Sequence, residues 1–258
     1  MKSKQQINYI TKWIKDYATK NKIKTLVVGV SGGIDSAVVS TLCARTGLTT
    51  IAVSMPIKQS KTTHKLSMAH GAWLADNFDN VLHVQRDLTP TFKQFEKLFP
   101  EGSALAFANS RSRLRMICLY QIAQDQGGIV VGTGNKVEDF GVGFFTKYGD
   151  GGVDISPIGD CLKTEVWAMG RDLGIFQEII DAAPTDGLWD DGRTDESQLG
   201  MSYPELEHAM SLDQLHDDDI EIKSLDRQGR TKLKRYREIR ARNLHKMQPI
   251  PVCQMPKE

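Results

Sequence analysis

The sequence has few cysteines, no long apolar run and almost no net charge, and each absence excludes a class of protein. Four cysteines are scattered through 258 residues without the short paired spacings of zinc sites or redox motifs. No apolar stretch approaches the roughly 20 residues of a membrane span, and the polar residues 1–6 do not open a secretion signal. We therefore expect a cytoplasmic protein with reduced thiols that does not insert into a membrane.

The near-neutral charge bears on the partners. Lysines and arginines number 33 and aspartates and glutamates 32, which leaves a formal net charge of +1. Binding to a nucleic-acid backbone usually needs a clear cationic excess or patch, so we do not expect nucleic acid as the main partner. The chain is 40% apolar and long enough to bury a full core, and we expect one domain over residues 1–258.

Apolar runs and helical periodicities alternate along the chain. An amphipathic helix is expected within residues 1–20, because Ile7, Ile10 and Ile14 recur at helical spacing. Strands are then predicted at 25–31, 49–55, 81–84 and 128–132, and helices at 34–45, 62–76, 88–99, 105–124, 163–173 and 176–182. This alternation predicts an α/β fold, a doubly wound parallel sheet with helices on both faces, whose core spans 24–251.

Two polar, glycine-containing stretches interrupt this pattern, near 134–157 and near 184–203. The first follows the last predicted strand, and open α/β sheets bind ligands beyond the carboxyl ends of their strands. We expect both stretches to be active-site loops. Farther along, the basic segment 223–246 lies beside an acidic stretch, which favours a solvated helix with charge pairs over a nucleic-acid or membrane face.

The most informative segment follows the first predicted strand and reads Gly29, Val30, Ser31, Gly32, Gly33, Ile34, Asp35, Ser36. Paired glycines at a strand-to-helix turn let backbone N–H groups converge on a phosphate, and the following helix adds its positive dipole end. Asp35 stands where a carboxylate can hold the magnesium ion of a polyphosphate. The segment lacks the Gly-Lys-Ser/Thr ending of a Walker loop and the spacing of a dinucleotide fingerprint. It resembles the loop of enzymes that split ATP between its α and β phosphates, and a purely structural turn is the alternative.

Three further segments make the resemblance specific. A helix with a basic first part lies at 109–116, a Gly-Thr-Gly-Asn-Lys-Val-Glu run at 132–138, and a Phe-Thr-Lys-Tyr-Gly-Asp-Gly run at 145–151. Together they resemble ammonia-dependent NAD synthetase, a member of the N-type ATP pyrophosphatases, from about Lys24 to about Pro251. The resemblance implies a Rossmann-like fold of the adenine nucleotide α-hydrolase type. It also implies a ligase that adenylates deamido-NAD with ATP and lets ammonia displace AMP, with NAD and pyrophosphate as the other products.

The resemblance also assigns roles to individual residues. It implies that residues 29–36 hold pyrophosphate, that Mg²⁺ is the cofactor and that ATP is the co-substrate. The implied metal ligands are Asp35 and Glu138; the ATP contacts beyond the loop are Thr133, Lys163 and Thr185; the deamido-NAD contacts are Arg113, Lys147, Asp154, His245 and Lys246. Lys163 and Thr185 are also expected to act in catalysis, and Asp150 to take a proton from ammonium.

Free ammonia is the expected nitrogen donor, because the segment before Asn21 has no room for a glutaminase domain. The resemblance further implies a homodimer in which both protomers contribute to the deamido-NAD pocket. Two alternatives remain at this point. One is a tRNA-modifying enzyme with the same ATP-splitting loop, and the other is a nucleotide sensor that binds ATP without turning it over.

Overall fold

Four parallel strands form the centre of the fold, in the order β3-β2-β1-β4. In this computed structural model, which describes residues 1–189 and 191–256, the strands are β1 (Thr25–Gly29), β2 (Thr49–Ser54), β3 (Val81–Gln85) and β4 (Gly128–Val130). Thr25 lies opposite Thr49 on one side and opposite Gly128 on the other. The inner strand β1 is therefore flanked by β2, the next strand along the chain, and by β4, the last strand.

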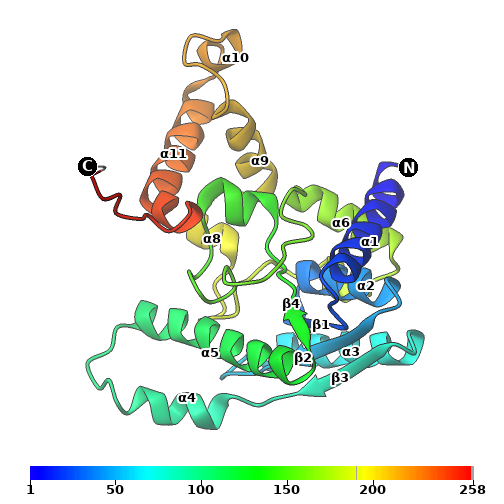
Figure 1. Cartoon of the computed structure of the whole chain (residues 1–258). Helices are drawn as coiled ribbons and strands as arrows, with labels where there is room; N and C mark the ends of the chain where they lie inside the picture. Colours follow the sequence, from blue (N-terminus) through cyan, green and yellow to red (C-terminus); the bar gives the residue numbers. More distant parts are fainter. Residues whose placement is uncertain (190, 257–258) are drawn as a thin grey trace.

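Helices cover both faces of this sheet (Figure 1). One face carries α2 (Ile34–Arg45) and α3 (Lys61–Asn77), and α1 (Lys2–Lys20), α6 (Lys163–Asp172) and α7 (Gln177–Ile180) pack around α2. The other face carries α5 (Ala104–Asp125), preceded by α4 (Thr89–Glu96). Val28 packs in the cluster of α1, α2 and α6, whereas its neighbour Val27 packs against Met116 and Leu119 of α5. The predicted doubly wound sheet with helices on both faces is confirmed.

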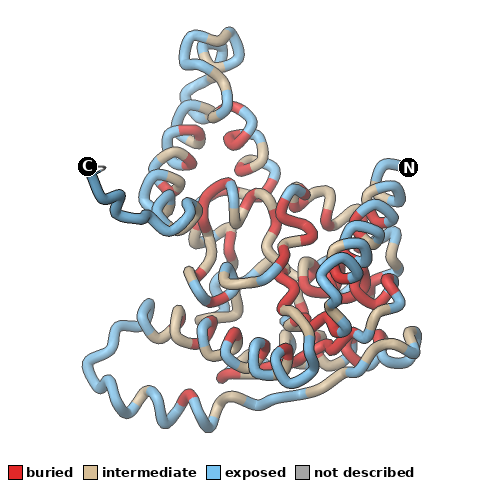
Figure 2. The backbone as a smooth tube through the Cα atoms, viewed as in Figure 1, coloured by how far each residue is buried: buried red, intermediate tan, exposed pale blue. Residues whose placement is uncertain are grey.

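The C-terminal third forms a helical projection with its own apolar cluster (Figure 1). Its helices are α8 (Asp195–Leu199), α9 (Tyr203–Leu212), α10 (Ile220–Lys223) and α11 (Arg227–Met247). Tyr236 and Ile239 of α11 pack with Leu206 of α9, while Arg237 pairs with Asp213 at 2.9 Å. Figure 2 shows buried residues concentrated around the strands and α2, with α10 mostly exposed. The basic tail is thus the partly solvated, charge-paired helix that its composition predicts.

The two predicted loops contain more structure than their polar composition indicates. Within 134–157 lies a short π-helix, η1 (Lys136–Val142), because Asn135 Oδ1 accepts hydrogen bonds from the N–H groups of its first turn. Within 184–203 lies α8, which a Thr194 and Ser197 capping box begins, and α9 starts at the last residue of that range. Residue 190 of the second loop and residues 257–258 of the predicted domain lie outside the described residues.

Several element ends also differ from prediction. β1 ends at Gly29 and β4 at Val130, two residues before the predicted ends, because the backbone beyond both turns into the loops that line the site. Val131 keeps only an isolated bridge, to Ile155. No helix within residues 1–189 and 191–256 is both long and apolar enough to cross a membrane. The four cysteines are free.

Candidate active site

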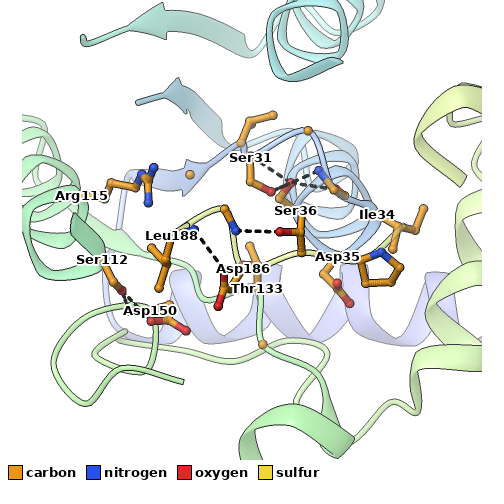
Figure 3. A pocket seen from close by; sticks show the side chains of 18 of the residues that line it. Ser31, Ile34, Asp35, Ser36, Ser112, Arg115, Thr133, Asp150, Asp186 and Leu188 are labelled. Atoms are coloured by element: carbon orange, nitrogen blue, oxygen red, sulfur yellow. Dashed lines mark hydrogen bonds between the residues drawn. The ribbon is translucent and has the colours of Figure 1, made fainter. Parts of the chain in front are cut away.

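A cavity of about 450 Å³ opens at the carboxyl ends of β1 and β4. The chain leaves β1 for α2 on one face and reaches β4 from α5 on the other, so this is the switch point where open α/β sheets bind ligands. The lining comes from the loop at 29–36, from 130–134, from 182–188 and from α5 (Figure 3). The phosphate-loop segment predicted from sequence therefore lies at the position where a ligand is expected.

The loop from Gly29 to Ser36 is held by its own hydroxyl groups. Ser36 Oγ accepts a hydrogen bond from Ser31 N–H at 3.1 Å and donates one to the Gly33 carbonyl at 2.9 Å (Figure 3). Gly32 has φ +92°, and a Cβ there would lie 2.5 Å from the Thr63 carbonyl oxygen, so only glycine fits. Gly33 is the N-cap of α2, and the first residues of this helix line the cavity. A glycine turn at the N-terminus of a helix is a place where proteins can bind an anion.

One buried lysine joins two carboxylates beside this loop. Lys163, with 2% of its side chain exposed, contacts Asp35 Oδ2 and lies 3.0 Å from Glu138 Oε1. Burial lowers the pKa of Lys163, but the two carboxylates outweigh burial and raise it. Burial raises the pKa of Asp35, and the Glu138 charge adds to the effect, whereas Lys163 and Tyr203 hold the pKa of Glu138 down. Two carboxylates thus share one ammonium group, and the cluster can accept a further positive charge.

Three members of this cluster were missed by sequence reasoning. Asn135 Nδ2 donates to Asp35 Oδ1 at 3.2 Å, and Tyr203 OH bridges Glu138 and Asp195. Asp195 is 5% exposed, and its Oδ1 has no hydrogen-bond partner among the described residues. Burial and the Glu138 charge raise the pKa of Asp195 to about 7. The sequence contained a signal for Asn135, which belongs to the same 132–138 run as Glu138. Tyr203 gave no such signal, because it reaches the site only through the packing of α9.

Asp150 and Arg115 form the opposite wall of the cavity (Figure 3). Asp150 Oδ1 accepts hydrogen bonds from Ser112 Oγ at 2.6 Å and Thr146 N–H at 3.0 Å, while burial raises the Asp150 pKa. The residue as a whole is nevertheless exposed, and it belongs to the cavity lining. Arg115 Nε donates to the Met55 carbonyl at 3.1 Å, and burial lowers the Arg115 pKa to about 10. Sequence reasoning missed Arg115.

The expected ATP contacts Thr133 and Thr185 also line the cavity. Thr185 belongs to the segment at 182–188, where its Oγ1 accepts from Gly187 N–H and donates to the Arg193 carbonyl, both at 3.2 Å. Arg111 of α5 donates to the Leu188 carbonyl at 3.0 Å, which holds this segment against the helix. The second loop is therefore docked over the cavity.

Four of the expected deamido-NAD residues lie together at the rim, outside the cavity lining. Arg113 Nε donates to the Lys147 carbonyl at 3.2 Å, and Lys147 Nζ to the His245 carbonyl at 3.3 Å. Lys246 Nζ donates to the Phe145 carbonyl at 2.8 Å. Thus α5, the 145–151 run and the end of α11 form one cationic strip.

The fifth expected residue, Asp154, lies apart from this strip. Its carboxylate accepts hydrogen bonds from Val130 N–H at 2.7 Å and from Tyr120 OH at 3.1 Å, so it ties the loop to the end of β4. Arg113, Tyr120 and Tyr148 line a second, shallow depression on the outer side of α5. Asp154 therefore sits between the cavity and that depression.

Comparison with known proteins gives consistent similarities. The family model described as NAD synthase matches residues 6–250. The chain is 37% identical over 225 residues to the NH(3)-dependent NAD(+) synthetase of Mesoplasma florum, covering 85% of this chain and 89% of that protein. It is 32% identical over 255 residues to the enzyme of the same name from Archaeoglobus fulgidus, covering 99% and 98%.

Solved structures are similar over the full length. NMN synthetase from Francisella tularensis matches with a TM-score of 0.85 and 29% identity, covering 98% of this chain and 99% of that one. NH3-dependent NAD synthetase from Campylobacter jejuni matches with a TM-score of 0.80 and covers 98% and 100%; at 22% identity it supports the fold alone.

Proposed function

Because this chain belongs to the NAD synthase family, we propose that it catalyses the ATP-dependent amidation of deamido-NAD to NAD with ammonia as nitrogen donor. The observation that carries the proposal is the meeting of the 29–36 loop, the Lys163 cluster and Asp150 around one cavity, with the cationic strip at its rim. A polyphosphate and an anionic dinucleotide can be bound side by side in this arrangement.

In this proposal the loop N–H groups and the N-terminus of α2 bind the phosphates of ATP. The nicotinate carboxylate attacks the α-phosphorus, and the bond to the leaving pyrophosphate breaks. Charge on pyrophosphate grows as it leaves, so donors already aimed at it stabilise the transition state. Lys163, Thr133 and Thr185 would contact the remaining phosphate oxygens, the first through its charge and the others through their hydroxyls.

Mg²⁺ fits the cluster as cofactor. Asp35 and Glu138 offer hard oxygen ligands with only one ammonium between them, and Asp195 adds an unpartnered buried oxygen nearby. Within residues 1–189 and 191–256, no group of three or more metal-type side chains is assembled. Mg²⁺ often needs only one or two carboxylates, because phosphates and water complete its shell, and there it would neutralise the phosphate charge.

The second step requires neutral ammonia, because ammonium has no lone pair with which to attack. We propose that Asp150 accepts this proton, since Ser112 and Thr146 hold its carboxylate in place at the cavity wall. Ammonia then attacks the carbonyl carbon of the adenylate, and AMP leaves. Arg115 is available in the same wall to bind an anionic oxygen.

Arg113, Lys147, His245 and Lys246 would bind the dinucleotide, with Asp154 at the edge of the cavity. We also propose a homodimer, because Ile117 and Tyr148 beside the shallow depression are 66% and 59% exposed and large apolar side chains favour an interface. The free cysteines fit a cytoplasmic location. Nucleic acid is not expected among the substrates.

One observation favours a second candidate substrate. The Francisella tularensis protein, which is similar over 98% of this chain, is described as an NMN synthetase. The same amidation carried out on nicotinate mononucleotide would yield NMN. Such a substrate would use the cavity and less of the rim, because it lacks the second nucleotide.

The experiment is pyrophosphate release from ATP and Mg²⁺ with either acid substrate, and with ammonium or glutamine. We expect turnover with deamido-NAD and ammonium, and none with glutamine alone. A higher kcat/KM with nicotinate mononucleotide would select the second candidate. Dependence on tRNA would indicate the tRNA-modifying alternative, and binding of ATP without release would indicate a sensor; either result would refute the proposal.

A further inference from the structure

A chain of hydrogen bonds, part-buried at His83 and buried beyond it, runs from the edge strand β3 to the 29–36 loop. His83 Nε2 lies 2.9 Å from Ser54 Oγ, which lies 2.7 Å from Ser67 Oγ, which in turn donates to the Val30 carbonyl at 2.7 Å. Ser54 and Ser67 are 0% and 2% exposed. None of these three side chains has a part in the proposed chemistry.

The direction of every hydrogen bond in this chain follows from its last acceptor. A carbonyl oxygen can only accept, so the Ser67 hydroxyl proton points to Val30. Ser67 Oγ must then accept from the Ser54 hydroxyl, and Ser54 Oγ must accept from His83. His83 is therefore protonated on Nε2 and is the first donor of the relay His83, Ser54, Ser67.

The relay ends where the orientation of one peptide group affects phosphate binding. The Val30 carbonyl belongs to the same peptide plane as Ser31 N–H, which lies in the loop and is held by Ser36. An anion site needs its N–H groups toward the ligand and its carbonyl oxygens turned away. Ser67 holds the Val30 carbonyl from the side of α3, and Gln59 Nε2, which belongs to the cavity lining, donates to the Ser31 carbonyl at 3.2 Å.

A glycine inside α3 leaves the space that the relay needs. At Gly71 a Cβ would lie 2.3 Å from His83 Nε2, the donor atom itself, and 2.4 Å from Cδ2. Glycine inside a helix costs roughly 1 kcal/mol relative to alanine. Its presence is explained by the imidazole that lies against it, so the relay includes a backbone position of α3 as well as three side chains.

We propose that His83 is a positioning residue for the phosphate-binding loop. It acts through Ser54 and Ser67 to fix the Val30–Ser31 peptide, whose N–H is bonded to Ser36 Oγ, and with it the shape of the loop. The proposal rests on the proposed use of residues 29–36 for the phosphates of ATP. It gives His83 and Gly71 an indirect effect on ATP binding through the loop, and no effect on the binding of deamido-NAD or ammonia.

The test compares His83→Met, which removes the donor, with His83→Gln, whose amide keeps one. Loss of one buried hydrogen bond predicts a rise of about 5- to 10-fold in the KM for ATP in His83→Met, with the other two KM values within about twofold. In His83→Gln the ATP KM should return to within about twofold of the parent. The matched control is Thr41→Val, which removes a buried hydroxyl that donates to the Ala37 carbonyl of its own helix.

Gly71→Ala gives a second, independent measurement. It should raise the ATP KM in the parent chain, where the imidazole must move, and change it by less than about twofold in a His83→Ala background. An unchanged ATP KM in His83→Met, equal rises in all three KM values, a glutamine variant as poor as the methionine one, or a Gly71→Ala effect that persists without the ring would each overturn the relay. If the parent itself releases no pyrophosphate, the proposed function fails instead.

Discussion

Two lysines at opposite ends of the site have pKa values that are shifted in opposite directions. Lys163 is almost fully buried, yet its pKa is raised, because Asp35 and Glu138 outweigh the cost of burial. Lys246 is half-buried, and burial lowers its pKa, because its direct partner is the Phe145 carbonyl and no carboxylate among the described residues forms an ion pair with it. Partners rather than burial alone decide the charge of a lysine here.

The contrast extends to the two ends as wholes. At the cavity end Lys163, Asp35, Glu138 and Tyr203 are already paired with one another, so removing one leaves others buried and unpaired. At the rim Arg113 and Lys147 are held by backbone carbonyls, which orient them without neutralising them. The rim is thus prepared for an anionic ligand, whereas the cavity end also helps to hold the fold together.

The largest expected effect comes from Lys163→Met. It leaves two largely buried carboxylates without their counterion, so the free energy of unfolding should fall by about 3–5 kcal/mol and synthetase activity should be lost. Urea denaturation and pyrophosphate release measure the two effects. The comparison variant is Lys246→Met, for which the free energy should change by about 1 kcal/mol or less. Equal losses in both variants would remove the distinction between the two ends.

Asp35→Ala should separate activity from stability. Lys163 keeps Glu138 as its partner in this variant, so the fold is retained, while turnover should fall by at least about 100-fold. Asp16→Ala, which removes an exposed carboxylate on α1, serves as the control. Full activity in Asp35→Ala would contradict its assignment as a metal ligand.

Arg113→Met tests the rim alone. Loss of one cation facing the dinucleotide should raise the KM for deamido-NAD about tenfold and leave the KM for ATP within about twofold. Steady-state kinetics with each substrate varied in turn measures both. Arg242 of α11, which donates to a carbonyl of its own helix, provides the control Arg242→Met. A larger change in the ATP KM than in the deamido-NAD KM would contradict the assignment of Arg113 to the rim.

The smallest effect is a difference in titration, measurable by NMR of ¹³C-labelled lysine side chains. Lys246 should lose its proton below pH 10.5, and Lys163 should keep its proton above that pH. The stability from Lys163 is complete below pH 10.5 and is lost as the pH rises through its raised pKa. For Lys246 the unfolding free energy increases as the pH rises from its lowered pKa toward 10.5. Lysines that titrate together would refute the contrast.

Sequence reasoning found the phosphate loop because all its chemistry lies within eight consecutive residues, and it found the parallel sheet because buried strands are continuous apolar runs. It missed Arg115, which lies two positions from the expected Arg113. On a helix that separation turns the side chain to another face, so one arginine faces the cavity and the other the rim. It missed α8 because capping residues also occur in loops.

By itself the sequence determined which segments form strands, where the glycine turn after β1 lies and which charged side chains could serve the site. These features depend on residues that are neighbours in the chain. Only the tertiary structure decided that Lys163 meets Asp35 across 128 positions, and that Tyr203 joins Glu138 to Asp195. It alone brought His83 against Gly71. Such contacts are set by how helices pack on the sheet, and that packing depends on the whole core at once.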